Sequence, residues 1–189
     1  MAVILPFKKR QTDPFESLLL PHMESLYRLA YRLSGQQSAA EDLVQDLLIK
    51  LYPRVDELQQ LEKLRPWLAR SLYNLFIDSV RSSKRNPVQG GEEELQSALD
   101  LAHDPQHRPD RIIEQQQFQV RIQVALKMLN EDQRNLINFH DVEGYTLPEL
   151  ETILDTPLGT LKSRLHRARA KLKDLLEMEP STETKRVRE

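Results

Sequence analysis

The segment LDTPLGTLKSRLHRARAKL, residues 154–172, contains the residues with the clearest chemical potential in the chain. It holds a single acid, Asp155, and five basic side chains: Lys162, Arg164, Arg167, Arg169 and Lys171. The whole chain, by contrast, has a formal net charge of -2. Closely spaced cations of this kind neutralise phosphate groups, so the segment indicates a nucleic acid as a binding partner.

This basic segment forms an amphipathic helix when its residues are placed about 100° apart. The apolar face consists of Leu158, Leu161, Leu165, Ala168, Leu172 and Leu176. The opposite face carries small and hydrogen-bonding residues, namely Thr160, Ser163, Arg167 and Ala170, with His166 beside them. Small residues allow close approach to a duplex, polar ones reach base edges and flanking cations meet phosphates. We therefore predict that the helix enters a major groove; the alternatives are a solvated face, a partner surface or, less favoured for lack of aromatic anchors, a membrane-surface helix.

The elements before this helix complete a helix-turn-helix pattern. Thr146 and Glu149 have the spacing of a capping box, which opens a short helix ending at Leu154. Asp155, Thr156 and Pro157 break the chain, and we expect Thr156 to cap the last helix and Pro157 to begin it. That helix should run to about Met178. A short capped helix, a tight turn and a basic helix are typical of DNA-binding domains.

Two further helices precede this pair. One is expected from about Arg111 to Leu129. Asn130 and Gln133 have the spacing of another N-terminal cap, and the helix that they open should reach about Val142. Gly144 suits the end of that helix.

The first half of the chain also shows helical periodicity. Asp13 and Pro14 cap and start a helix that should continue to Ser34 and Gly35. Ser38 and Glu41 have capping-box spacing and open a helix that ends near Pro53. A polar segment, residues 53–64, follows, and another apolar helix face begins around Pro66 and Trp67.

The segment between the two halves differs in charge and composition. Residues 86–110 contain one basic and six acidic residues, whereas residues 1–85 have a net charge of +3 and residues 111–189 a net charge of zero. This segment has little apolar surface to offset its ordering entropy, although EELQSALDLA within it could form a short helix.

We therefore predict an all-α chain of two small helical domains joined by a flexible acidic linker. The expected boundaries are an N-terminal extension 1–13, a first domain 14–85, a linker 86–110, a second domain with the helix-turn-helix 111–178 and a tail 179–189.

Composition excludes several other classes. The absence of cysteine excludes disulfides and thiolate zinc sites, and it fits a cytoplasmic protein. No apolar run is long enough to span a membrane, and the N-terminus does not match a secretory signal. No nucleotide-binding loop or HExxH motif is present. His103 and His107 are spaced for a metal, but neighbouring prolines disfavour a regular helix there. We expect no catalytic residue, metal or cofactor.

Motifs in both halves resemble the extracytoplasmic-function class of bacterial sigma factors. YTLPELETILDTPLGTLKSRLHRARAKL is similar to the C-terminal domain four of that family. AEDLVQDLLIKLY resembles the core-polymerase-binding helix of domain two, and RPWLARSLYNLFIDSVRSSKR resembles its promoter-melting and −10-reading helix. The resemblance extends roughly from Phe15 to Leu176. It implies a factor that binds core RNA polymerase and directs promoter-specific initiation; the alternative is a polymerase-independent helix-turn-helix regulator.

The resemblance also implies contacts with the polymerase. Domain two would dock on the clamp coiled coil of the largest subunit through Asp42, Leu43, Gln45 and Asp46, with Leu43 and Leu47 divided between core and interface. The flap of the second largest subunit would be a further contact. If the family resemblance is set aside, the favoured interpretation of Asp42 and Asp46 is that they are ordinary surface residues of a capped helix. An anti-sigma factor is expected as a partner, because such proteins typically clamp both domains.

Promoter contacts follow from the same resemblance. Asn74 would contact the −10 element, and Arg70 and Arg81 would contact the DNA backbone there. Residues 53–64 would form a pocket for a flipped base. Trp67 is a stacking candidate but is more often a core residue. On the −35 element, Lys162, Ser163, His166 and Arg167 would contact bases, whereas Thr160, Arg164, Arg169 and Lys171 would contact phosphates. His140 is a further candidate near the DNA, with a satisfied surface histidine as the favoured alternative.

The chain departs from the family pattern at several positions. Glu151 replaces a small alanine in the first helix of the helix-turn-helix, and a glutamate there is expected to change the docking angle. Leu129-Asn130 replaces Leu-Pro, and Leu161 replaces a valine. The acidic linker would either thread toward the polymerase cleft, by mimicking nucleic-acid charge, or serve as a solvated tether.

Overall fold

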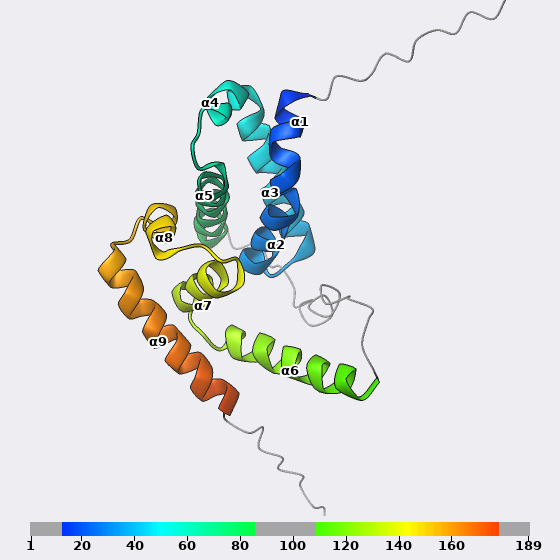
Figure 1. The fold of residues 1–189 in the computed structure, drawn as a ribbon, viewed down its shortest axis with the longest axis vertical. Helices are drawn as coiled ribbons and strands as arrows, with labels where there is room; N and C mark the ends of the chain where they lie inside the picture. Colours follow the sequence, from blue (N-terminus) through cyan, green and yellow to red (C-terminus); the bar gives the residue numbers. More distant parts are fainter. Residues whose placement is uncertain (1–12, 86–108, 178–189) are drawn as a thin grey trace, which may run out of the picture. The chain divides into compact units, whose positions relative to one another are not determined.

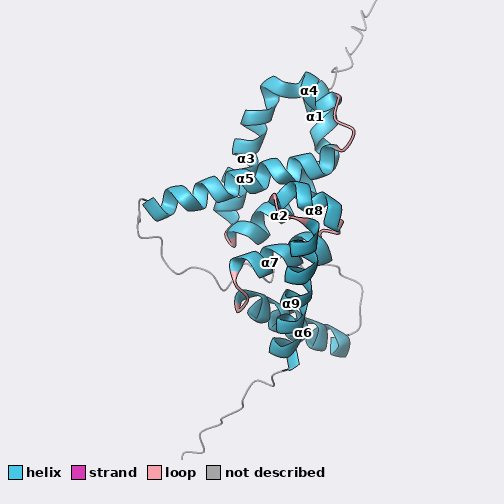
Figure 2. Cartoon of the chain, turned by 90° about the vertical axis from the view of Figure 1, so that its left-hand side faces the viewer, coloured by secondary structure: helices cyan, strands magenta, loops and turns pink. Residues whose placement is uncertain are grey.

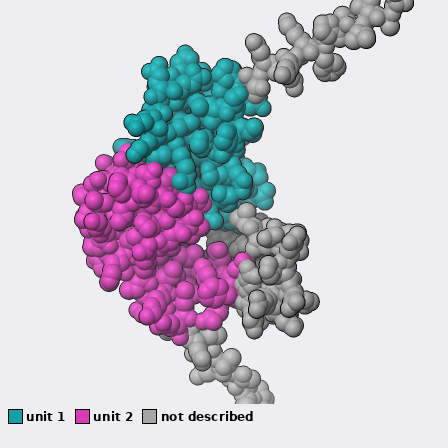
Figure 3. Space-filling view, in the orientation of Figure 1, with its two compact units in different colours: residues 1–87 teal, residues 88–189 magenta. Residues whose placement is uncertain are grey.

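The computed structural model describes residues 13–85 and 109–177, and every regular element in these ranges is a helix. The chain divides into two compact units, residues 1–87 and 88–189 (Figures 1 and 3). The predicted all-α architecture of two helical domains is therefore confirmed. Several predicted features lie wholly or almost wholly outside the described residues. They are the N-terminal extension, the linker with its possible short helix, the pair His103 and His107, and the C-terminal tail. The exact domain boundaries stay predictions.

The first unit is built on three packed helices. Helices α2 (Met23–Ser34), α3 (Gln37–Leu51) and α5 (Leu64–Arg85) all contact one another (Figure 1). Shorter elements connect and cover them: α1 (Pro14–Leu19), the 3-10 turns η1 (Leu20–His22) and η2 (Tyr52–Arg54), and α4 (Val55–Gln59). Fully buried leucines from several of these helices form the core, including Leu29, Leu47, Leu58, Leu68 and Leu72.

Two expectations for the first unit are wrong. The helix expected from Pro14 to Ser34 is interrupted at η1, because Pro21 has no N–H for the helical ladder. Ser38 does not cap α3: the helix begins earlier, at Gln37, so Ser38 lies inside its first turn, and the Glu41 carboxylate accepts a bond from the Gln37 side chain instead. The predicted cap at Asp13 is confirmed, since its carboxylate accepts the Phe15 N–H at 2.9 Å.

The second unit packs three helices against one long helix. Helix α9 (Leu158–Glu177) contacts α6 (Pro109–Lys127), α7 (Glu131–Ile137) and α8 (Leu147–Leu154). Figure 2 shows these helices as well as those of the first unit, with no strand among the described residues. Arg121 on α6 donates to the Leu176 carbonyl at 2.5 Å, which connects α6 to the end of α9.

Two of the local caps expected in the second unit are present, at the starts of α7 and α8. The Asn130 side chain accepts the Gln133 N–H at 2.9 Å and caps α7. Thr146 and Glu149 form the predicted capping box at the start of α8. Both caps satisfy amide groups that the first helical turn leaves without a partner.

A single π turn, η4 (Asn138–Val142), follows α7 directly. Its i to i+5 bond joins the Glu143 N–H to the Asn138 carbonyl at 2.9 Å. The chain then reverses at Gly144, whose φ of 73° is a left-handed conformation that glycine adopts without steric cost. This ending agrees with the predicted helix to about Val142, but the π geometry was not foreseen. The turn brings His140 and Asp141 to α9.

The turn between α8 and α9 is tight and partly strained. Asp155 ends α8 with a φ of 49°, the one left-handed residue other than glycine within the described ranges. Helix α9 begins at Leu158, one residue later than predicted, so Pro157 takes the position where Thr156 was expected. Thr156 donates its hydroxyl to the Leu154 carbonyl at 3.1 Å. The expectation that Thr156 caps α9 is therefore wrong.

No helix within residues 13–85 and 109–177 combines the length and apolar character needed to cross a membrane. The same ranges contain no group of three or more His, Cys, Asp or Glu side chains arranged to hold a metal ion.

The packing of α3 gives a stability prediction from two neighbouring positions. Leu47 is fully buried, whereas Ile49 is 64% exposed. We expect Leu47→Ala to lower the free energy of unfolding by about 2–5 kcal/mol, because it leaves a cavity in the core. Ile49→Ala should change it by less than about 0.5 kcal/mol. Urea unfolding followed by Trp67 fluorescence measures both, and equal losses would contradict this account of the core.

Candidate nucleic-acid interface

Helix α9 buries its predicted apolar face and exposes the opposite one. Leu161, Leu165 and Ala168 are at most 4% exposed, and Leu158, Leu172 and Leu176 are half-buried. The residues predicted to contact DNA lie on the opposite face and its flanks. Lys162, Ser163, Arg164, His166, Arg167, Arg169 and Lys171 are exposed, and Thr160 is half-buried. The structure therefore places all eight of these side chains at least partly in solvent on one helix.

The start of α9 is held by a side chain from α8. The Leu158 N–H donates to Glu151 Oε1 at 3.0 Å, across seven residues of sequence. Leu158 is the first residue of α9, so this amide has no acceptor within the helix. Glu151 therefore supplies the cap that was expected from Thr156, and its carboxylate also complements the positive end of the helix dipole.

Several cations of α9 pair with acids of the same unit. Arg169 binds Asp141, Arg164 lies 4.0 Å from Asp132, and Lys173 lies 3.6 Å from Glu177. No ion pair is found for Lys162 or Lys171 with another residue of the described ranges. Arg167 likewise has no acid beside it there, and its Nε donates to the Ser163 carbonyl at 3.3 Å. Among the predicted phosphate contacts, Arg164 and Arg169 thus have a neighbouring carboxylate.

The Arg169 pair belongs to a three-residue cluster with η4. Arg169 Nε donates to Asp141 Oδ2 at 2.9 Å, and its Nη2 donates to Asp141 Oδ1. His140 Nδ1 lies 2.8 Å from Asp141 Oδ1 and 3.2 Å from Arg169 Nη2. The two contacts are alternatives, because a protonated Nδ1 donates to the carboxylate whereas an unprotonated Nδ1 accepts from the guanidinium. The hydrogen bond from Arg169, more than any other influence, lowers the pKa of Asp141, and the same bond raises the pKa of Arg169. His140 is therefore partly buried, with Asp141 and Arg169 beside its ring, and its role near DNA stays a prediction.

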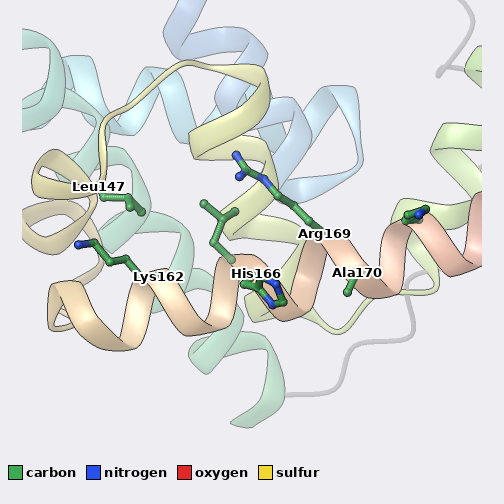
Figure 4. Close-up of a pocket in the computed structure, with 7 residues that line it drawn as sticks. Leu147, Lys162, His166, Arg169 and Ala170 are labelled. Carbon is green, nitrogen blue, oxygen red and sulfur yellow. The ribbon is translucent and has the colours of Figure 1, made fainter.

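One side of α9 borders a shallow hollow of about 430 Å³ (Figure 4). Leu147 of α8 and Leu165 and Ala170 of α9 give it an apolar lining. Its basic lining comes from Lys162, His166, Arg169 and Lys173 of α9. These four residues recur at helical spacing, so they form one basic line along the helix.

The candidate −10 residues lie on one side of α5. Asn74 and Arg81 are exposed and Arg70 is half-buried. Their spacing of four and seven residues places them on one stripe, opposite the buried Leu68, Leu72 and Phe76. Arg81 Nη1 lies 3.9 Å from Asp78 on the same stripe.

Trp67 lies at the start of that stripe, where its ring is partly buried and contacts another side chain. It is half-buried, and the Arg54 guanidinium lies 5.4 Å from the centre of its ring. Arg54 also binds Glu57 at 2.7 Å, and this hydrogen bond lowers the pKa of Glu57. The polar segment 53–64 is thereby packed onto α5 through Arg54, and it contains the helix α4, which the sequence did not indicate.

The candidate polymerase residues divide between core and surface. Asp42, Gln45 and Asp46 are exposed on α3, whereas Leu43 and Leu47 are 6% and 0% exposed. Two exposed apolar residues, Ile49 at 64% and Tyr52 at 59%, continue the exposed face of α3. Sequence reasoning did not single them out, although Ile49 follows Asp42, Gln45 and Asp46 at helical spacing.

Both units match models of one protein family. Residues 18–86 match sigma-70 region 2, and residues 119–172 match sigma-70 region 4. These ranges contain the α3 and α5 surfaces in the first case and the α8–α9 pair in the second.

Whole-chain comparisons agree with these matches. The ECF RNA polymerase sigma factor SigW of Bacillus subtilis is 30% identical over 89% of this chain and 92% of its own length. SigE of Mycolicibacterium smegmatis is 35% identical over 86% of this chain, which spans 61% of that relative's length. A solved structure, the sigma factor RpoE of Bartonella quintana in complex with the anti-sigma factor NepR, is 29% identical with a TM-score of 0.67, covering 89% of this chain and 99% of that one.

The lowered pKa of Asp141 predicts a pH-dependent contribution to stability. Its ionised form is favoured by folding, so the contribution is complete above the unfolded pKa of about 3.9 and is lost as the pH falls toward the lower folded value. We expect Asp141→Asn to lower the melting temperature at pH 7, with a difference from the wild type that stays nearly constant down to about pH 4 and shrinks as the pH falls further. Thermal unfolding followed by circular dichroism from pH 7 to pH 3 measures this. A constant difference across that range would contradict it.

Proposed function

Because the chain belongs to the extracytoplasmic-function group of the sigma-70 family, we propose that it binds core RNA polymerase and directs it to specific promoters. The first unit would read the −10 element and the second the −35 element. The observation that carries this proposal is the capped helix α8 followed by α9, whose basic face is exposed while its apolar face is buried. RNA synthesis would be catalysed by the polymerase, so the chain would have no catalytic residue and would act in the cytoplasm.

For the −35 element, we assign the base contacts to Lys162, Ser163, His166 and Arg167. These residues are exposed on the part of α9 that follows the turn. Thr160 and Lys171 would contact phosphates directly. Arg164 and Arg169 would also contact phosphates, in competition with Asp132 and Asp141.

For the −10 element, we assign Asn74 to the bases and Arg70 and Arg81 to the backbone. Separated bases need exposed polar groups with cations nearby, and the stripe on α5 supplies both. The Arg54–Trp67 contact supports a role for Trp67 in holding the segment 53–64 rather than in stacking on a base, because its ring already has a cationic partner.

For core polymerase, we propose a docking surface made by Asp42, Gln45 and Asp46, continued by Ile49 and Tyr52. The acids would meet basic groups of the clamp coiled coil and the apolar pair would add buried area. Leu43 is buried within the unit, so its contribution would be to hold α3 in place. The second unit would contact the flap of the second largest subunit.

An anti-sigma factor is the remaining expected partner. The Bartonella quintana relative was solved in complex with such a protein, NepR, and this chain covers 99% of that sigma factor. We propose that this chain is likewise regulated by an anti-sigma factor, which would bind it and cover its surfaces for polymerase and DNA. A polymerase-independent regulator is not favoured, because a simple DNA-binding protein would not need the region 2 unit.

The primary test is run-off transcription with purified core polymerase on a library of promoter fragments, with and without the chain. We expect transcripts only when the chain is present, from templates that share −35 and −10 elements. Binding to duplex DNA without transcription or core binding would instead support the plain regulator.

Two variants of α9 separate base reading from phosphate binding. Arg167→Ala should relax discrimination at one −35 position by about 1–3 kcal/mol, because it removes a base-edge contact. Lys171→Ala should weaken binding to all sequences alike and reduce the slope of log affinity against log salt by about 1. Holoenzyme binding to promoter fragments over a salt series measures both. Identical behaviour of the two variants would refute these assignments.

A charge reversal on α3 tests the polymerase surface. Asp46→Lys should lower affinity for core polymerase by roughly tenfold or more, because it places like charges opposite one another. Glu16→Lys makes the same change at an exposed site on α1 and should leave affinity close to that of the wild type. Competition against a fluorescently labelled chain for core polymerase measures this. Equal losses in the two variants would point to net charge rather than to the α3 surface.

A further inference from the structure

The side chain of Glu151, in α8, accepts a hydrogen bond from the backbone of the first turn of α9. Its Oε1 accepts the Leu158 N–H at 3.0 Å, and the residue is otherwise exposed. The N-terminal flanking position of α9 is Pro157, whose side chain has no hydrogen-bonding group. The cap of α9 therefore depends on a side chain from the neighbouring helix.

This bond acts at the end of α9 from which DNA is read. Lys162 and Ser163 lie about one turn beyond Leu158, so the orientation of the first turn sets where their side chains point. The turn itself gives little other restraint: Thr156 bonds back to α8 at Leu154, and Asp155 holds an uncommon left-handed conformation. Below this turn, Leu161 and Leu165 fix the helix only through apolar contacts, which are not directional.

Reading a base edge demands more accurate placement than binding a phosphate. A hydrogen bond to a base weakens steeply with angle and distance, whereas a cation attracts a phosphate from many positions. A slight change in the angle between α8 and α9 would therefore reduce sequence discrimination more than it reduces general affinity for DNA.

We propose that Glu151 is a positioning residue for sequence reading: its carboxylate fixes the first turn of α9 against α8 and so orients the base-edge residues. The inference rests on the proposed function of α9 as the −35 reader. It assigns to Glu151 a role in selectivity without any contact between Glu151 and DNA.

Four variants of the full chain, assembled with core polymerase, test this role. Glu151→Gln keeps an acceptor and removes the charge. Glu151→Ala removes both the acceptor and the charge. Glu151→Asp keeps the charge but shortens the arm by one methylene, so that it no longer reaches Leu158. Glu149→Ala removes the neighbouring cap, at the start of α8, and controls for a general loss of stability.

The measured quantity is the ratio of holoenzyme affinities for a promoter with its −35 element and for the same fragment with that element scrambled. We expect Glu151→Ala and Glu151→Asp to lower this ratio by about fivefold, while Glu151→Gln and Glu149→Ala stay within about twofold of the wild type. Affinity for the scrambled fragment rises equally in the Ala and Gln variants, because both remove one negative charge near the DNA.

Two results would overturn the inference. Equal ratios for the Ala and Gln variants would mean that the hydrogen bond has no part in selectivity, and a loss in Glu149→Ala as large as in Glu151→Ala would mean that general stability is responsible. If the wild-type chain starts no transcript with core polymerase, the proposed function fails as well. A wild type that transcribes, with variants that do not differ, refutes only the role of Glu151.

Discussion

The second unit depends on one helix having two opposed faces. The apolar face of α9, centred on Leu161, Leu165 and Ala168, is the surface against which α6, α7 and α8 pack. Its burial holds the unit together and at the same time fixes which side chains remain in solvent. The basic face is therefore presented as a consequence of folding, and no separate element is needed to display it.

Hydrogen bonds from the elements around α9 help to fix its orientation on the core. The π turn brings Asp141 to Arg169, and Glu151 holds the Leu158 amide from the other side of the helix-turn-helix. Arg121 bonds the last turn of α9 through the Leu176 carbonyl. Hydrogen bonds are directional, whereas apolar contacts are not, so these three bonds restrict how α9 lies on its core.

Most features that depend on near neighbours in sequence could be predicted, although the caps expected from Ser38 and Thr156 on the same local grounds are wrong, and features that depend on folding could not. The register of α9 and the caps at Asp13, Asn130 and Thr146 follow from spacing within a few residues. The cap by Glu151 spans seven residues and the Asp141–Arg169 pair spans 28, so neither leaves a local pattern. The break at Pro21 was missed because apolar periodicity continues across it, and the π turn because its residues have the same periodicity as an α-helix.

The acids that pair with α9 also bear on how a DNA-binding chain finds its site. In the proposed DNA complex, a phosphate that approached Arg164 or Arg169 would compete with a carboxylate beside the guanidinium, so the net gain in affinity for random sequence would be reduced. Weak attraction to random sequence shortens each visit to the wrong site. If α9 reads the −35 element as proposed, trapping on bulk DNA would limit the search less, and the time spent at a site would depend on Lys162 and Arg167, which have no acid beside them in the described part of the chain.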